Sequence, residues 1–120
     1  MIRITDKHKC VYRKQKGYWS YKWISKEYSI SIDEVKRLAS ETEEYLNTEF
    51  GKDLPTRIKK YLILHTNNFD LFQRPELIAK MKPVDILKIK NIGKTSLAQI
   101  AFCLEKHGYI EDQNDWLRKK

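Results

Sequence analysis

The chain has 120 residues and carries 24 Lys and Arg against 16 Asp and Glu, which gives a net charge of +8. This length favours one ordinary domain, or one small domain with an appendage. The positive balance favours a polyanionic partner, either nucleic acid or an anionic membrane surface. No apolar run approaches the roughly 18 residues of a membrane span, and the first ten residues lack the apolar core of a secretory signal. We therefore expect a cytoplasmic protein that does not insert into a membrane.

The charge is divided among three segments. Residues 1–26 hold eight bases and one acid, residues 27–49 hold two bases and seven acids, and residues 50–120 hold 14 bases and eight acids. An acidic segment between two basic ones indicates separate surfaces rather than one uniform polycation.

Residues 10–24 alternate aromatic and basic side chains on both sides of Gly17. This pattern predicts a short β-hairpin or arm around residues 15–17. Two roles stay open for its rings: they pack into the domain, or they stack on nucleic-acid bases while the cations bind phosphates. The candidate nucleic-acid- or partner-binding residues of this arm are Arg13, Lys14, Lys16, Tyr18, Trp19 and Trp23.

Residues 23–46 predict two helices joined by a turn at residues 29–31. Ser31 and Glu34 have the spacing of a capping box at the start of the second helix, whose apolar positions are Ile32, Val35, Leu38, Ala39, Thr42 and Leu46. The pair is similar to a helix-turn-helix, although Asp33 and Glu34 would repel phosphates where the second helix would enter a groove. The acidic outer face of that helix is an alternative surface for a protein partner.

Residues 50–120 predict a series of further helices. Gly51 is expected to end the acidic helix, and Asp53 to cap a helix over residues 54–65 that packs His65 and exposes Lys59. The loop over residues 66–74 is expected to be anchored in the core by three apolar side chains, Phe69, Leu71 and Phe72. Short helices are expected to start at Pro75 and Pro83. A longer helix is expected over residues 94–107, ended by Gly108, and its inward-facing residues are Leu97, Ile100, Ala101 and Leu104. The polar tail is expected to fray unless Trp116 and Leu117 pack back onto the domain.

Gly93, Lys94 and Thr95 match the end of a nucleotide-binding P-loop, GxxxxGK[ST]. The pattern also requires a glycine five residues before Gly93, where this chain has Lys88, and a single glycine cannot wrap two phosphates. The alternative is a helix-hairpin-helix in which Gly93 permits a positive φ or the close approach of an external backbone. The amides that begin the last helix would then bind a nucleic-acid phosphate.

The segments LPTRIKKYL (54–62) and ELIAKMKPVDILKIKNIGKTSLAQIAFCLEKHGY (76–109) resemble the C-terminal domain of the bacterial RNA polymerase α subunit. The resemblance covers about half of the chain and implies a compact helical module that grips the minor groove of promoter DNA and touches transcription proteins. Residues 1–50 have no counterpart in it, so we expect a stand-alone protein rather than an α subunit. Residues 63–75 are longer than in the family.

The resemblance implies a set of DNA-binding residues. Arg57 matches the arginine that enters the minor groove, while Asn91, Gly93, Lys94 and Ser96 match the hairpin and the start of the last helix. Four positions match family positions with a changed residue type, and they are Lys60, Tyr61, Thr95 and Gln99.

These observations predict a mainly α fold with three parts: an arm and acidic helix over residues 1–50, a helix-hairpin-helix DNA-binding domain over 51–110, and a tail over 111–120. The expected function is non-enzymatic binding of double-stranded DNA in transcription or its regulation, with RNA polymerase, another transcription protein or a second copy as further partners. Two alternatives stay open, a protein-interaction adaptor or inhibitor acting through the acidic helix, and a single-strand binder acting through the aromatic arm. Cys10 and Cys103 favour reduced thiols. The pairs His8/Cys10 and Cys103/His107 lack usual zinc-finger spacing, and no catalytic constellation stands out, so no metal, cofactor or enzymatic activity is expected.

Overall fold

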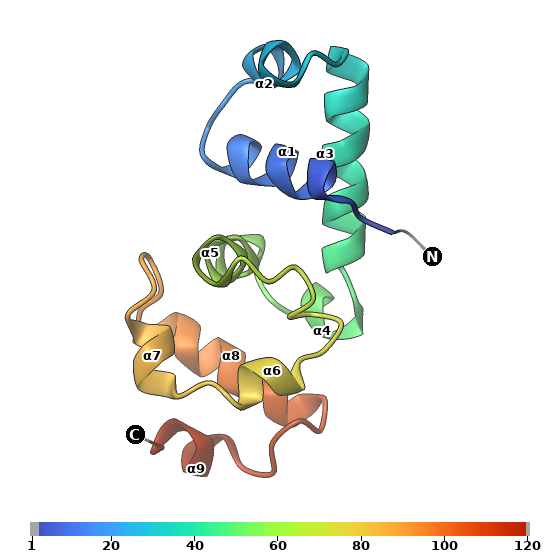
Figure 1. Ribbon diagram of the computed structural model, residues 1–120. Coiled ribbons are helices and arrows are strands. Elements are labelled where there is room, and N and C mark those ends of the chain that lie inside the picture. The colour runs from blue at the N-terminus through green and yellow to red at the C-terminus, as the bar shows by residue number, and fades with distance from the viewer. Residues whose placement is uncertain (1–2, 120) are drawn as a thin grey trace. The chain divides into compact units, whose positions relative to one another are not determined.

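The computed structural model describes residues 3–119, and every regular element in that range is a helix (Figure 1). The chain divides into two compact units, one up to Leu46 and the other from Asn47 onward. The first unit contains α1 (Asp6–Lys16), α2 (Tyr21–Tyr28) and α3 (Ile32–Leu46). The second contains α4 (Glu49–Lys52), α5 (Thr56–Thr66), α6 (Glu76–Ala79), α7 (Pro83–Leu87), α8 (Lys94–Lys106) and α9 (Gln113–Leu117).

The predicted β-hairpin in residues 10–24 is wrong, because residues 6–16 form α1. Thr5 begins this helix: its hydroxyl accepts a hydrogen bond from the His8 amide, and the His8 ring accepts one from the Thr5 amide. Lysine, arginine and glutamine have good helix propensity, and they fill much of the segment. His8 is therefore buried within a capped helix.

Helix α3 packs against both α1 and α2 to form the core of the first unit. That core consists of Val11, Ile24, Val35, Leu38 and Ala39, with Tyr21, Tyr28 and Ile30 against it. The predicted helix pair is confirmed, and Ser29 makes the turn with a left-handed φ of 54°.

Two details at the start of α3 differ from the prediction. Ser31 Oγ accepts from the Glu34 amide at 3.0 Å, as in a capping box. The Glu34 carboxylate, however, pairs with Arg37. Ile32, one of the apolar positions of the predicted helix, is 42% exposed.

The segment between α3 and α5 also differs from the prediction. The acidic helix ends at Leu46, and Gly51 lies inside the separate short helix α4, whose first turn is capped by the Thr48 hydroxyl. Asp53 does not cap α5, which begins after Pro55 without a side-chain cap from any described residue. The Asp53 carboxylate instead binds the side chains of Lys106 and His107 at the end of α8.

The core of the second unit is built mainly from α5, the following loop and α8. The loop residues Phe69, Leu71 and Phe72 are buried, as predicted, and so are the inward positions of α8, which are Leu97, Ile100, Ala101 and Leu104. Gly108 follows α8 with a left-handed φ of 81°. On α5 the predictions for two residues are wrong: His65 is exposed, and Lys59 is buried with its ammonium bonded to Asn47.

The C-terminal tail docks back through a helix rather than fraying. The Asp112 carboxylate accepts from the amides of Asn114 and Asp115 and so begins α9. Trp116 is 1% exposed, and its indole N–H donates to the carbonyl of Ala79 at 2.9 Å. Among the described residues, no helix combines the length and apolar character that crossing a bilayer requires.

Candidate nucleic-acid interface

The turn between α7 and α8 places a buried residue between two exposed ones. Asn91 has a left-handed φ of 67°, a region that asparagine tolerates better than most side chains. Ile92 is 4% exposed and anchors the turn in the core. Gly93 has φ −106° and ψ −170°, an extended conformation open to any residue. Of the two roles considered for Gly93, a positive φ is therefore not found there, and Asn91 adopts one instead.

The amides that begin α8 lie at an exposed corner of the second unit. Gly93 is the N-cap, and no side chain of the described residues caps the helix there. Gly93, Lys94 and Thr95 are all exposed, and a Cβ built on Gly93 would have no heavy atom of the described chain within 4 Å. The first amides of a helix lack intrahelical acceptors and carry the positive end of its dipole, so this corner has the chemistry of an anion site.

Arg57 joins this corner from α5. One guanidinium nitrogen, Nη1, donates to the Asn91 carbonyl at 2.7 Å, and the other, Nη2, donates to Ser96 Oγ at 2.9 Å. Arg57 is exposed, whereas Ser96 is 3% exposed. Two of the five N–H donors of the guanidinium thus hold it beside the start of α8, and its charge still faces outward.

The remaining predicted residues flank this corner. Lys60 and Tyr61 lie three and four residues after Arg57 on α5, and hence on the same side of the helix. The Lys60 ammonium sits 4.9 Å from the centre of the Tyr61 ring. Gln99 lies one turn after Thr95 on α8, and both are exposed.

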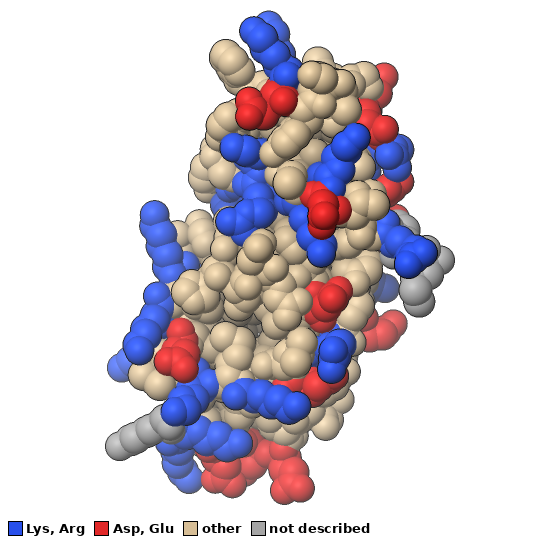
Figure 2. Space-filling view, viewed as in Figure 1, with Lys and Arg blue, Asp and Glu red and all other residues tan. Residues whose placement is uncertain are grey.

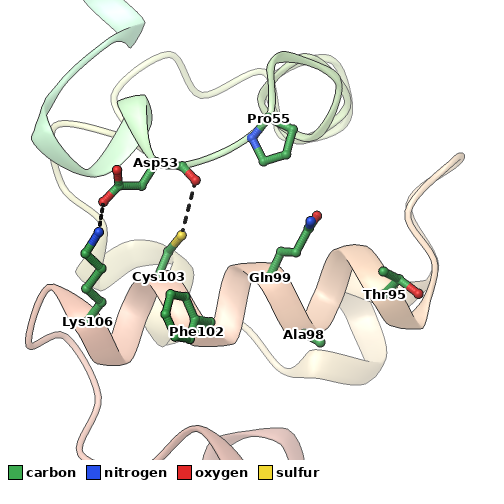
Figure 3. Close-up of a pocket in the computed structure, with 8 residues that line it drawn as sticks. All are labelled: Asp53, Pro55, Thr95, Ala98, Gln99, Phe102, Cys103 and Lys106. Atoms are coloured by element: carbon green, nitrogen blue, oxygen red, sulfur yellow. Dashed lines mark hydrogen bonds and ion pairs between the residues drawn. The ribbon is translucent and has the colours of Figure 1, made fainter.

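A pocket of about 460 Å³ runs along α8 beside the candidate interface (Figure 3). Thr95 and Gln99 line it at one end, with Gln99 pointing toward Pro55, and the exposed Phe102 lies further along the helix. Asp53 lies on the opposite wall: its carbonyl accepts from the Cys103 thiol at 3.5 Å, and its carboxylate accepts from Lys106 at 3.1 Å. Burial is the larger cause that raises the pKa of the Cys103 thiol, and Asp53 adds to it.

Further basic side chains surround the α7–α8 turn. Figure 2 shows lysine and arginine side chains along the edge of the second unit where α7 and this turn lie in Figure 1. The exposed lysines of this segment are Lys80, Lys82, Lys88, Lys90 and Lys94. Asp85 lies 3.6 Å from the Lys88 ammonium, and because both are largely exposed this pair gives little stabilisation.

The arm residues of the first unit occupy α1, α2 and the turn between them. Tyr18, Trp19 and Trp23 are 84%, 39% and 60% exposed, so these three rings do not pack into the core, whereas Tyr12 is buried. Lys14 lies over the Trp19 ring at 4.2 Å. Arg13 is exposed on α1, and Lys16 pairs with Glu43 at 2.5 Å.

Three of the five acidic residues of α3 form ion pairs within the first unit. Glu41 bonds the His8 ring at 2.8 Å and Arg37 at 2.8 Å, and these two hydrogen bonds lower the pKa of its carboxyl. Glu34 pairs with Arg37, which lowers the pKa of Glu34, and Glu43 pairs with Lys16. The other two acidic residues of the helix, Asp33 and Glu44, are exposed.

Sequence reasoning missed the anchoring of Arg57. Both acceptors, the Asn91 carbonyl and the Ser96 hydroxyl, had been assigned to DNA contact, yet they hold the arginine. One available signal is that Asn91 and Ser96 flank Gly93 in the sequence. The lysines around α7 carry a second signal, because bases recur there through residues 80–94.

Within residues 3–119, no group of three or more His, Cys, Asp or Glu side chains is arranged to hold a metal ion. His107 bonds Asp53 at 2.7 Å, and Cys103 is buried beside the same residue.

Compared with known proteins, the chain gives no significant match to a protein-family model, a curated protein or a solved structure.

Proposed function

We propose that the second unit binds double-stranded DNA without catalysis, with α7, the turn over residues 88–93 and α8 acting as a helix-hairpin-helix. The observation that carries this proposal is the open start of α8, where Gly93, Lys94 and Thr95 are exposed and no described side chain caps the helix, with Arg57 held beside it. One phosphate can accept from the first amides of α8 and gain attraction from Lys94. Contacts of this kind position a protein on the duplex without reading its sequence.

Arg57 gives the complex its preference among duplexes. A guanidinium beside a backbone-gripping turn can enter an A·T-rich minor groove, whose narrow width strengthens the negative potential. The resemblance to the C-terminal domain of the RNA polymerase α subunit supports this assignment, and it makes transcription or its regulation the proposed setting. One module of this size binds weakly, so a second copy or a transcription protein would raise the effective concentration.

Substitution of Gly93 tests the proposal directly. The backbone there already has the β-region geometry of an N-cap, so Gly93→Asp and Gly93→Asn should both fold and stabilise α8 by a few tenths of a kcal/mol. Asp places a carboxylate where the phosphate would bind, whereas Asn supplies a neutral cap of the same shape. Gly93→Ala is the third member of the series, because it leaves the amides uncapped.

The measurement is fluorescence anisotropy with an A·T-rich duplex, with circular dichroism as the folding control. We expect Gly93→Asp to lose on the order of tenfold or more in affinity, the scale of one hydrogen bond to a charged group, and Gly93→Asn to lose less. Gly93→Ala should remain nearest to the unsubstituted protein. A folded Gly93→Asp variant that binds duplex DNA as well as the unsubstituted protein would refute the proposed interface.

A further inference from the structure

The first unit exposes three aromatic rings within six residues. Tyr18 and Trp19 form the turn between α1 and α2, and Trp23 lies in the first turn of α2. Their exposed fractions are 84%, 39% and 60%. Large rings normally supply core area in a small protein, so this concentration of exposed rings marks an interaction surface.

The backbone at Tyr18 is an independent sign of a special role. Tyr18 has a φ of 70°, in the left-handed region that bulky residues rarely adopt. It follows α1 at the position where glycine usually ends a helix, and the amides of Tyr18 and Trp19 bond back to the carbonyls of Gln15 and Lys14. Gly17 directly precedes it with an ordinary φ of −85°. The chain thus places a strained tyrosine, rather than its available glycine, at this turn.

Lysines accompany these rings. Lys14 lies 4.2 Å from the centre of the Trp19 ring, and Lys26 lies 5.6 Å from that of Trp23. Lys22, Trp23 and Lys26 also line a hollow of about 170 Å³. Each indole therefore has a cation over one face of its ring. A nucleotide with an unpaired base can use both groups at once, by stacking its base on the ring and placing its phosphate near the ammonium.

We propose that this aromatic-basic face, formed by Lys14, Tyr18, Trp19, Lys22, Trp23 and Lys26, binds single-stranded nucleic acid. Duplex DNA is a poor ligand because its bases are already stacked and paired. An anionic membrane surface would also attract tryptophan and lysine. However, Ile24, the aliphatic residue of α2, is fully buried in the unit's core, so this helix has no aliphatic side chain to insert. The binding is independent of the duplex interface proposed for the second unit.

The test uses the full chain and oligothymidine. Trp116 is buried, whereas Trp19 and Trp23 are exposed, so quenching of tryptophan fluorescence by stacked bases would report on the first unit. We expect Trp23→Ala to weaken oligothymidine binding about 5- to 150-fold, the range for loss of one stacked base. Tyr18→Gly should weaken binding and also raise the thermal midpoint, because glycine adopts the left-handed conformation without strain.

Phe102→Ala is the matched control, since Phe102 is an exposed ring (55%) in the second unit, and it should leave oligothymidine affinity unchanged. Loss of affinity in Trp23→Ala and Tyr18→Gly but not in this control would support the proposal. Absence of oligothymidine binding, equal binding by all variants, or binding to phosphatidylserine vesicles instead would overturn it. Gly93→Asp separates the two proposals, because it should remove duplex binding and leave oligothymidine binding intact.

Discussion

The guanidinium of Arg57 and the hydroxyl of Ser96 form a hydrogen bond of 2.9 Å that joins α5 to α8 across 39 residues of sequence. A second bond, from Arg57 to the Asn91 carbonyl, fixes the other side of the fork. The arginine is therefore held in place before any ligand arrives, and a preorganised side chain loses less entropy on binding.

This relationship predicts coupling between Arg57 and Ser96 in DNA binding. Ser96→Ala removes one anchor and should lower affinity for an A·T-rich duplex by about 2- to 12-fold, the equivalent of one ordinary hydrogen bond. In an Arg57→Ala background the same substitution should have no further effect. Anisotropy titrations of the four proteins form a double-mutant cycle. Strictly additive losses would show that Ser96 does not act through Arg57.

The salt dependence of duplex binding tests the role assigned to Lys94. Each phosphate neutralised by a lysine releases counterions, so the logarithm of the binding constant falls with the logarithm of salt concentration. Lys94→Gln should reduce the magnitude of that slope by about one. Lys52→Gln, an exposed lysine on α4 of the same unit, serves as the control and should leave the slope unchanged. Binding insensitive to salt would contradict a backbone-gripping site.

Several elements could be predicted from the sequence because local signals agreed with the packing. Helix α8 has apolar residues at helical spacing between two glycines, and its inward positions are buried as expected. The burial of the loop residues Phe69, Leu71 and Phe72 could also be predicted, since three large apolar side chains in a short polar loop are expected to pack into the core.

Other elements depended on contacts that no local pattern reveals. The hairpin prediction for residues 10–24 fails because their aromatic residues have strand propensity, while the bond from His8 to Glu41 that fixes α1 spans 33 residues. Asp53 resembles an N-cap, yet it pairs with Lys106 and His107, more than 50 residues away. Ion pairs between distant segments can thus reassign residues whose local signal is clear.

The Asp53 cluster predicts a pH-dependent contribution to stability. Hydrogen bonds from His107 and then Lys106 lower the pKa of Asp53 below its usual 3.8. A carboxyl with a depressed pKa stabilises the folded state above the unfolded pKa, and this contribution is lost as the pH falls through the folded value. The free energy of unfolding should therefore be lower in Asp53→Asn than in the unsubstituted protein at pH 7, and the two should converge well below pH 3.8.

Urea titrations would measure this difference in a background with Trp19→Phe and Trp23→Phe, so that Trp116 alone reports on the second unit. Asp115→Asn is the matched control, because Asp115 is exposed and its pair with Arg118 lies between two largely solvated groups at 3.4 Å. A difference between Asp53→Asn and the unsubstituted reference that stays constant as the pH falls from 7 to about 2 would mean that ionisation of this carboxyl makes no pH-dependent contribution to folding.

The packing of the C-terminal tail leads to a prediction about stability. This prediction distinguishes a tail that forms helix α9 from the frayed tail expected from its polar sequence. Trp116 is 1% exposed and donates to the Ala79 carbonyl. Trp116→Ala should lower the free energy of unfolding by about 3–5 kcal/mol, as for other buried tryptophans. Trp116→Phe keeps most of the apolar contact and loses the hydrogen bond, so about 1 kcal/mol is expected for that bond. Circular dichroism in urea would measure both, and a loss below about 1 kcal/mol for Trp116→Ala would indicate that the tail frays in solution, because a solvated indole contributes little to folding.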